Sequence, residues 1–338
     1  MSIARISYKI AALGAASALV LSGCVAGEGE TQSQAATGAE TLTLDFATYN
    51  PLSLVIKEKG WLEAELEDVE VNWVQSAGSN KANEGLRSET LDIGSTAGSA
   101  ALLNRANGTP IKTISLYSQP EWAALVVGPD SDIADVSDLA GKTVAATKGT
   151  DPYFFLIQAL AEAGVEIDGV EVQNLQHADG AAALKNGSVD AWSGLDPITA
   201  GLEKDWDAQL FYRNIDFNTW GFLNARADFL EESPELAQAV VDVYEYAREW
   251  AESNGDEVAE ILADYAGLEL DVAERVLERT ALDIDPVPGD VQRSVLEIVG
   301  PIFIETGDVD DQETIDDALA NLFDDSFAKK ADSKRFAG

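Results

Sequence analysis

The stretch 144–164 constrains the fold more than any other part of the chain, because it predicts a strand, a tight turn and a helix in succession. The apolar run 144–147 suits a buried parallel strand, and Gly149 in the turn is free to take a positive φ. Asp151 is expected to cap the helix, with Pro152 as its first residue. Open α/β sheets hold small ligands where a strand leads into a helix in this way.

The same succession of strand, small or polar loop and helix occurs three times between residues 41 and 105. This repetition predicts an α/β fold with a mostly parallel sheet. A second α/β unit surrounds the stretch 144–164, and the chain is mainly helical from Ala225 onward. The strands expected in the first unit are 42–46, 69–73, 91–94 and 111–117, and its helices are 52–58, one that ends at Arg87 and one that opens at 95–99 and ends at Arg105.

The length of 338 residues suggests about two domains. The net charge of −38, from 60 acidic and 22 basic residues, argues against a nucleic-acid partner because there is no basic surface. This acidity keeps an exported protein soluble or reflects a saline habitat. Cys24 is the only cysteine and His177 the only histidine, which excludes a Cys/His zinc site. No metal and no cofactor are therefore expected.

The N-terminus predicts an export signal followed by a lipid anchor. Arg5 and Lys9 precede the apolar run 10–21, which is too short to span a bilayer. The run ends in Leu-Ser-Gly-Cys, which resembles the lipobox of bacterial lipoproteins, with Cys24 as the lipidated residue. We expect a signal peptide at 1–23, a flexible tether at 24–40 and anchoring to the outer face of the cytoplasmic membrane. The alternative is a plain signal peptide with an incidental cysteine.

Several motifs in a fixed order carry a resemblance to a known family. They are Lys57-Glu58-Lys59-Gly60-Trp61-Leu62-Glu63, the run from Glu84 to Gly94, Asp138-Leu139-Ala140-Gly141-Lys142-Thr143-Val144-Ala145, Lys148-Gly149-Thr150, and Gly187-Ser188-Val189-Asp190-Ala191-Trp192 with Asp196-Pro197. Over about residues 41–325 the chain resembles a type II periplasmic binding protein of the aliphatic sulfonate, nitrate and taurine ABC-transporter group. The order and spacing of the motifs, rather than any single one, carry this resemblance.

The resemblance implies two α/β lobes that close like a hinge on a small ligand and deliver it to a membrane permease. Lobe one would comprise 41–127, including a crossover at Ala123–Val127, and a helical C-terminal part at 220–338 that begins with a second crossover at Trp220–Leu223. Lobe two would comprise 128–219. Such a protein is not an enzyme, and we expect a monomer. One histidine and no cysteine in the mature core, which follows the tether, argue against an enzyme on the same fold.

The same resemblance places the ligand among strand ends and helix starts, where unpaired N–H groups attract an anion. Asn50 and Asp196 precede prolines and could equally be helix caps, Trp192 could be core, and Lys148 could face solvent. The expected ligand-binding residues are Tyr49, Asn50, Leu52, Ala77, Gly78, Ser79, Thr96, Gly98, Ser99, Glu121, Trp122, Lys148, Gly149, Thr150, Asp151, Trp192 and Asp196.

The pair Asp151-Pro152 departs from the family pattern, because Asp151 adds negative charge at the helix start and Pro152 lacks an N–H. An anion would then bind at the lobe-one helix starts, 78–80 and 96–99. Alternatively, the ligand is zwitterionic, cationic or a neutral heterocycle such as a thiamine-type pyrimidine or riboflavin, and Asp151, Glu121 or Asp196 could hold an amine. A ligand-sensing surface module is a further alternative. His177 is expected to cap or decorate a lobe-two helix without a functional role.

Overall fold

The structure is a computed structural model that describes residues 41–336, which belong to one compact unit. The predicted signal peptide, Cys24 and tether lie outside the described residues. Among residues 41–336, no helix is both long and apolar enough to cross a membrane.

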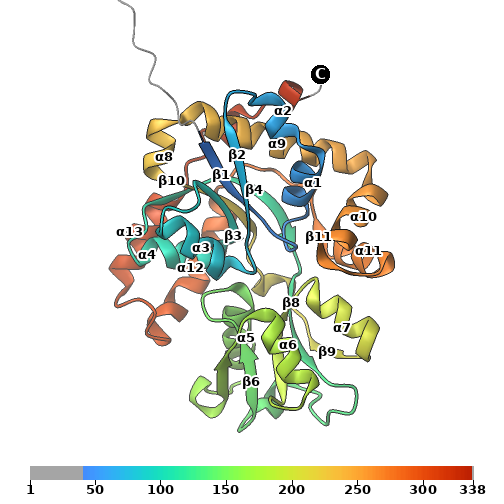
Figure 1. Cartoon of the computed structure of the whole chain (residues 1–338). Helices are drawn as coiled ribbons and strands as arrows, with labels where there is room; N and C mark the ends of the chain where they lie inside the picture. Colours follow the sequence, from blue (N-terminus) through green and yellow to red (C-terminus); the bar gives the residue numbers. More distant parts are fainter. Residues whose placement is uncertain (1–40, 337–338) are drawn as a thin grey trace, which may run out of the picture. The chain divides into compact units, whose positions relative to one another are not determined.

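Two sheets organise the described residues, and we call the part of the chain around each sheet a lobe (Figure 1). Lobe one is residues 41–120 and 221–336, around a six-stranded sheet in the order β11-β4-β10-β3-β1-β2. Lobe two is residues 123–212, around a five-stranded sheet in the order β7-β6-β8-β5-β9. The fold is therefore mixed α/β, as the sequence predicts.

Lobe one contains two groups of elements that are far apart in the sequence. Its strands are β1 (Thr41–Phe46), β2 (Glu70–Gln75), β3 (Ile93–Ala97), β4 (Ile111–Pro120), β10 (Gly221–Arg226) and β11 (Thr280–Ala281). Its helices are α1 (Pro51–Lys59), α2 (Trp61–Glu65), α3 (Ser79–Arg87), α4 (Gly98–Ala106), α8 (Ala227–Glu232), α9 (Pro234–Ser253), α10 (Gly255–Ala266), α11 (Leu270–Glu278), α12 (Asp290–Glu305) and α13 (Gln312–Leu322).

Lobe two is one continuous segment of the chain. Its strands are β5 (Ala123–Val127), β6 (Thr143–Ala146), β7 (Glu171–Asn174), β8 (Ala191–Leu195) and β9 (Gln209–Tyr212), and its helices are α5 (Asp151–Glu162), α6 (His177–Lys185) and α7 (Ile198–Trp206). In each lobe three strands run parallel: β1 pairs with β2 and β3, and β6 pairs with β7 and β8. The strands β10 and β5 run antiparallel to their neighbours.

Local signals place α1 and the turn before α5 as the sequence predicts. The side chain of Asn50 accepts a hydrogen bond from the Ser53 N–H, Pro51 is the first residue of α1, and Gly60 ends the helix with φ +63°. Gly149 has φ +76°, the positive value that the turn requires. These features depend on neighbours in the sequence, so they are predictable from it.

Two expectations about boundaries are wrong. Strand β3 continues through Ala97, whereas the sequence predicts a helix opening at 95–99, because residues 95–97 pair with residues 221–223 of β10. Helix α5 is capped by Thr150, with Asp151 as its first helical residue. The segments expected to be crossover strands, Ala123–Val127 and Trp220–Leu223, correspond to β5 and the start of β10: β5 pairs with β8 and β9, and β10 pairs with β3 and β4. They adjoin 121–122 and 213–220, where the chain passes between the sheets.

The apolar core is continuous between the lobes. Phe154 of α5 and Phe303 of α12 are both almost fully buried, and their ring centroids lie 4.8 Å apart. The opposite face of the lobe-two sheet has a separate small core around Trp192. This packing fixes the start of α5 against lobe one.

Candidate functional site

Two small cavities, each of about 10 Å³, lie between the lobes. The first is lined from lobe one by Tyr49, Ser79 and Ala97 and from lobe two by Thr150, Asp151 and His177. Tyr49 and Trp122 also line the second cavity, which reaches Asp196 and Thr280. A volume of this size holds about one water molecule. The lobes must therefore separate to admit a larger solute.

The first cavity lies where strands end and helices begin in both lobes. Ala97 is the last residue of β3, Ser79 and His177 are the first residues of α3 and α6, and Asp151 is the first residue of α5. Helix starts present unpaired N–H groups and the positive end of the helix dipole. Neither cavity has a lysine or arginine in its lining, so these helix starts are the main source of positive potential there.

The carboxylate of Asp151 joins lobe two to lobe one and to the segments between them. It accepts hydrogen bonds from Trp122 Nε1 at 2.9 Å, from the Thr219 N–H at 2.7 Å, from Thr219 Oγ1 at 2.8 Å and from the Ser99 hydroxyl. Burial raises the pKa of Asp151, against the opposing effect of these hydrogen bonds. An amine of a ligand would have to displace one of these donors.

Tyr49 lines both cavities from lobe one, and Ser95 connects it to the buried carboxylate of Asp45, which lines neither. Asp45 is 1% exposed and accepts from the Ser95 N–H at 2.8 Å and from Ser95 Oγ at 3.0 Å. Burial raises the pKa of Asp45 to about 7. The Tyr49 hydroxyl donates to the Ser95 carbonyl at 3.0 Å, and its ring meets that of Trp122 edge-on at 6.1 Å. These donors to Asp45 belong to its own lobe, whereas the donors to Asp151 belong to lobe one and to the segments between the lobes.

Asp196 forms a third buried carboxylate, at the second cavity. It accepts from the Ala200 N–H at 3.0 Å and from the Thr199 hydroxyl, and it pairs with Arg279 at 3.4 Å. Burial raises the pKa of Asp196, while the Arg279 charge opposes that shift. Because Arg279 lies just after α11 of lobe one, this ion pair is another link between the lobes.

The structure brings together about half of the residues expected from the sequence. Tyr49, Ser79, Trp122, Thr150, Asp151 and Asp196 line one or both cavities. Gly78 precedes Ser79 and lies against His177, and Ser99 reaches the cleft through its bond to Asp151. Gly98 packs against Phe222 at the start of α4, and Gly149 forms the turn before α5.

The other expected residues line neither cavity. The Asn50 amide donates to the Tyr244 hydroxyl at 3.0 Å, and Leu52 is fully buried in the core. Thr96 Oγ1 accepts from Asn224 inside the sheet, and Glu121 pairs with Arg213 at 2.5 Å. Trp192 is fully buried in the small core of lobe two. The remaining two, Ala77 and Lys148, are exposed.

His177 is the cleft residue to which sequence reasoning assigned no role. It is 2% exposed at the start of α6 and lines the first cavity. The residues around His177 in the sequence form no motif. Its place after a strand could still have predicted a position in the cleft, because His177 follows β7 as Asp151 follows β6. Helix starts after parallel strands meet at one edge of a sheet.

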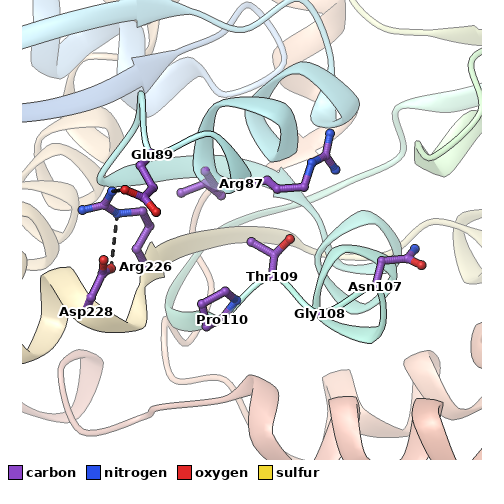
Figure 2. A pocket seen from close by; sticks show the side chains of 9 residues that line it. Arg87, Glu89, Asn107, Gly108, Thr109, Pro110, Arg226 and Asp228 are labelled. Carbon is purple, nitrogen blue, oxygen red and sulfur yellow. Dashed lines mark ion pairs between the residues drawn. The ribbon is translucent and has the colours of Figure 1, made fainter.

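A larger hollow of about 210 Å³ lies at the opposite end of the lobe-one sheet (Figure 2). It adjoins the start of β4 and the end of β10, whereas the cleft adjoins the ends of β1 and β3. Its Arg226 is already surrounded by Glu89, Asp92 and Asp228 at 3.3–3.8 Å. The helices α3 and α4 present their C-terminal, negative ends here. This hollow is therefore a poorer anion site than the cleft.

In the described part of the chain, no group of three or more His, Cys, Asp or Glu side chains could hold a metal ion.

Comparison with known proteins agrees with this geometry. A family model described as NMT1/THI5 like matches residues 51–258. A Bacillus subtilis (strain 168) protein whose name describes aliphatic sulfonate binding is 31% identical over 290 residues, covering 84% of this chain and 86% of that protein. The alkanesulfonate-binding protein SsuA from Xanthomonas axonopodis pv. citri, bound to MOPS, superposes with a TM-score of 0.75 at 22% identity, covering 84% of this chain and 99% of SsuA.

The nitrate-binding protein NrtA from Synechocystis PCC 6803 has the same fold, with a TM-score of 0.73 at 14% identity over 86% of this chain and 88% of NrtA. Two sheets with a cleft between them, together with these superpositions, define a type II periplasmic binding protein fold. The chain belongs to the NMT1/THI5-like family.

Proposed function

We propose that this chain is the extracytoplasmic substrate-binding protein of an ABC importer, and that it captures a small sulfonate-type anion between its lobes for delivery to a membrane permease. It binds its ligand without chemically changing it, acts as a monomer and is held at the outer face of the membrane by a lipid on Cys24.

One observation carries the proposal: the starts of α3, α5 and α6, from both lobes, line the same cavity. A solute bound there touches both lobes, so its binding energy favours the closed arrangement. Relatives named for binding aliphatic sulfonates and taurine support the choice of an anion.

A thermal-stability screen of the untagged protein tests the proposal. The panel contains taurine, ethanesulfonate, nitrate, a thiamine-type pyrimidine and riboflavin. A ligand present at 100 times its dissociation constant raises the free energy of unfolding by about 2.7 kcal/mol. Stabilisation by a sulfonate is expected. If only a heterocycle stabilised the protein, the ligand would be a heterocycle rather than a sulfonate. If no member of the panel stabilised it, the proposal would be overturned.

A matched pair of variants locates the site. Ser79→Leu fills the start of α3 inside the cavity, whereas Ser88→Leu places the same side chain on the exposed end of that helix. Only Ser79→Leu should abolish the stabilisation by ligand. Equal loss in both variants would show that the ligand does not bind in the cleft.

A further inference from the structure

The imidazole of His177 has one nitrogen without a hydrogen-bond partner among residues 41–336. That nitrogen is Nε2, and the side chain is 2% exposed. Asn80 Oδ1, at the start of α3, also lacks a partner within the described residues. A Cβ atom placed on Gly78 would lie 2.9 Å from both atoms, so they flank one point on the cavity wall. Buried polar atoms without partners destabilise the folded state, so a ligand that pairs with both is favoured.

The hydrogen bonds of Thr147 determine which nitrogen of His177 carries the proton. The single hydroxyl proton of Thr147 is donated to the Leu175 carbonyl at 2.7 Å. Thr147 Oγ1 can therefore only accept from His177 Nδ1, which lies 3.2 Å away. In the neutral ring Nδ1 is then the donor, and Nε2 presents a lone pair to the cavity.

Backbone N–H donors at the start of α3 face the same point beside Gly78. The cap residue of this nine-residue helix is Gly78, no side chain caps it, and its first turn contains no acidic residue. The N–H groups of the first turn and the positive end of the helix favour an anion. An anion at this point would meet the N–H groups of α3 and two acceptors, Asn80 Oδ1 and the lone pair of Nε2. A half-turn of the Asn80 amide replaces its oxygen with an NH₂ donor, whereas Nε2 becomes a donor only by taking up a proton.

Building on the proposed function, we propose that the anionic head group of the ligand binds between the start of α3 and His177, and that one proton from solvent binds with it at Nε2. A sulfonate has only acceptor oxygens, so a lone pair on Nε2 would repel it. A proton there turns Nε2 into a donor and supplies the positive charge that the lining otherwise lacks. The only bond formed is the N–H bond at Nε2, and the proton comes from hydronium or a buffer acid in solvent, which is left as water or the buffer base; no bond of the ligand changes.

The surroundings leave His177 neutral before the anion binds. Burial alone lowers the pKa of His177 to about 4. The titratable side chains on the walls of this cavity are Asp151 on α5 and Tyr49 before α1, and α6 itself carries the exposed Asp179. An anion in contact with Nε2 raises the pKa of His177 in the complex. Between the free and bound values the affinity falls about tenfold per pH unit as the pH rises.

Calorimetry of the untagged full chain with ethanesulfonate tests the inference. Titrations at pH 7 in bis-Tris and in Tris, whose ionisation enthalpies differ, give the number of protons taken up per ligand. Sulfonate buffers are avoided because they would compete. The wild type should take up protons on binding, and the number per ligand should rise toward one when the titrations are repeated at lower pH, between the free pKa of about 4 and the bound pKa of His177. His177→Gln keeps an amide donor toward the anion, so it should bind with no uptake and with an affinity independent of pH.

Two controls separate His177 from other groups. Asp179→Asn changes an exposed charge on the same helix, and Asp45→Asn removes the carboxyl whose pKa is about 7; both variants should keep the full proton uptake. Since His177 is the only histidine of the chain, one imidazole NMR signal reports its protonation in the wild type without any substitution.

The outcomes distinguish this inference from the proposed function. Ethanesulfonate binding without proton uptake, with an unchanged histidine signal, would overturn the inference and leave the proposed function standing. Binding of taurine but not of ethanesulfonate would do the same, because the ammonium group would then supply the donor. No binding by any member of the panel would overturn both.

Discussion

The starts of α3 and α5 face one cavity from opposite lobes, but their polar groups are used differently. The first turn of α5 contains Asp151, whose carboxylate accepts hydrogen bonds from Ser99, Trp122 and Thr219. The start of α3 has Gly78 as its cap and no acidic residue in its first turn. The side chain of Asn80 and the facing His177 each keep an unpartnered polar atom within the described residues.

This difference separates two roles that a helix start can have in a cleft. A carboxylate at the start of α5 satisfies the positive helix end from within the protein and connects the lobes. A glycine at the start of α3 leaves the helix end to an external group. Two helices with the same orientation toward a cleft therefore need not contribute equally to binding.

Removing the Asp151 carboxylate should give the largest effect. Asp151→Ala leaves buried donors on Ser99, Trp122 and Thr219 without their acceptor, so we expect the free energy of unfolding to fall by about 3 kcal/mol in urea titrations. Asp190→Ala removes an exposed carboxylate that accepts one backbone bond, from Thr143, and should cost well under half as much. Equal losses would mean that Asp151 does not connect the lobes.

Closing the start of α3 should give the largest effect on binding. Gly78→Ala places a Cβ 2.9 Å from His177 Nε2, at the point assigned to the anion, and should weaken ligand binding at least about 30-fold, or about 2 kcal/mol. Gly108→Ala introduces a side chain at a similarly unfavourable φ of +90°, but into open space. Calorimetry should show unchanged affinity for Gly108→Ala. A similar loss in both would attribute the effect to backbone strain.

Asp45 tests whether a buried carboxylate with donors from its own lobe behaves differently from Asp151. Its pKa of about 7 lies above that of an unfolded aspartate, so the folded state binds the extra proton between about pH 4 and pH 7. This group therefore lowers the free energy of unfolding as the pH rises through that window, by up to about 1.4 kcal/mol per pH unit. Urea titrations of Asp45→Asn at several pH values should lack this contribution to the pH dependence of the free energy of unfolding. An unchanged pH dependence would show that Asp45 is not its source.

The fold and half of the site were predictable because their signals are local. Asn50, Pro51 and Gly60 set the limits of α1 within ten residues, and the family motifs identify the two-lobed architecture. The extension of β3 was not predictable, since its last residues pair with β10 (Gly221–Arg226), which is far away in the sequence.

The roles of Asp151 and His177 were hidden for the same reason. The residues next to Asp151 in the sequence predict a helix cap. The donors that hydrogen-bond its carboxylate, Ser99 and Thr219, lie 52 and 68 residues away in the sequence. His177 carries no motif, and its function depends on Gly78 and Asn80 of the other lobe. Contacts between lobes of this kind leave no periodic pattern in a single sequence.

Lys148 should give the smallest effect, and it tests whether the positive charge beside α5 takes part in binding. The side chain is exposed, and its ammonium group lies 5.5 Å from the centroid of the Tyr153 ring, outside both cavities. Lys148→Ala should change the free energy of unfolding by no more than about 0.5 kcal/mol. The affinity for a sulfonate should stay within about twofold, since Lys148 is not part of the lining. A tenfold loss in calorimetry, absent from the exposed control Lys185→Ala at the end of α6, would restore Lys148 as an anion partner and place the head group at α5 rather than α3.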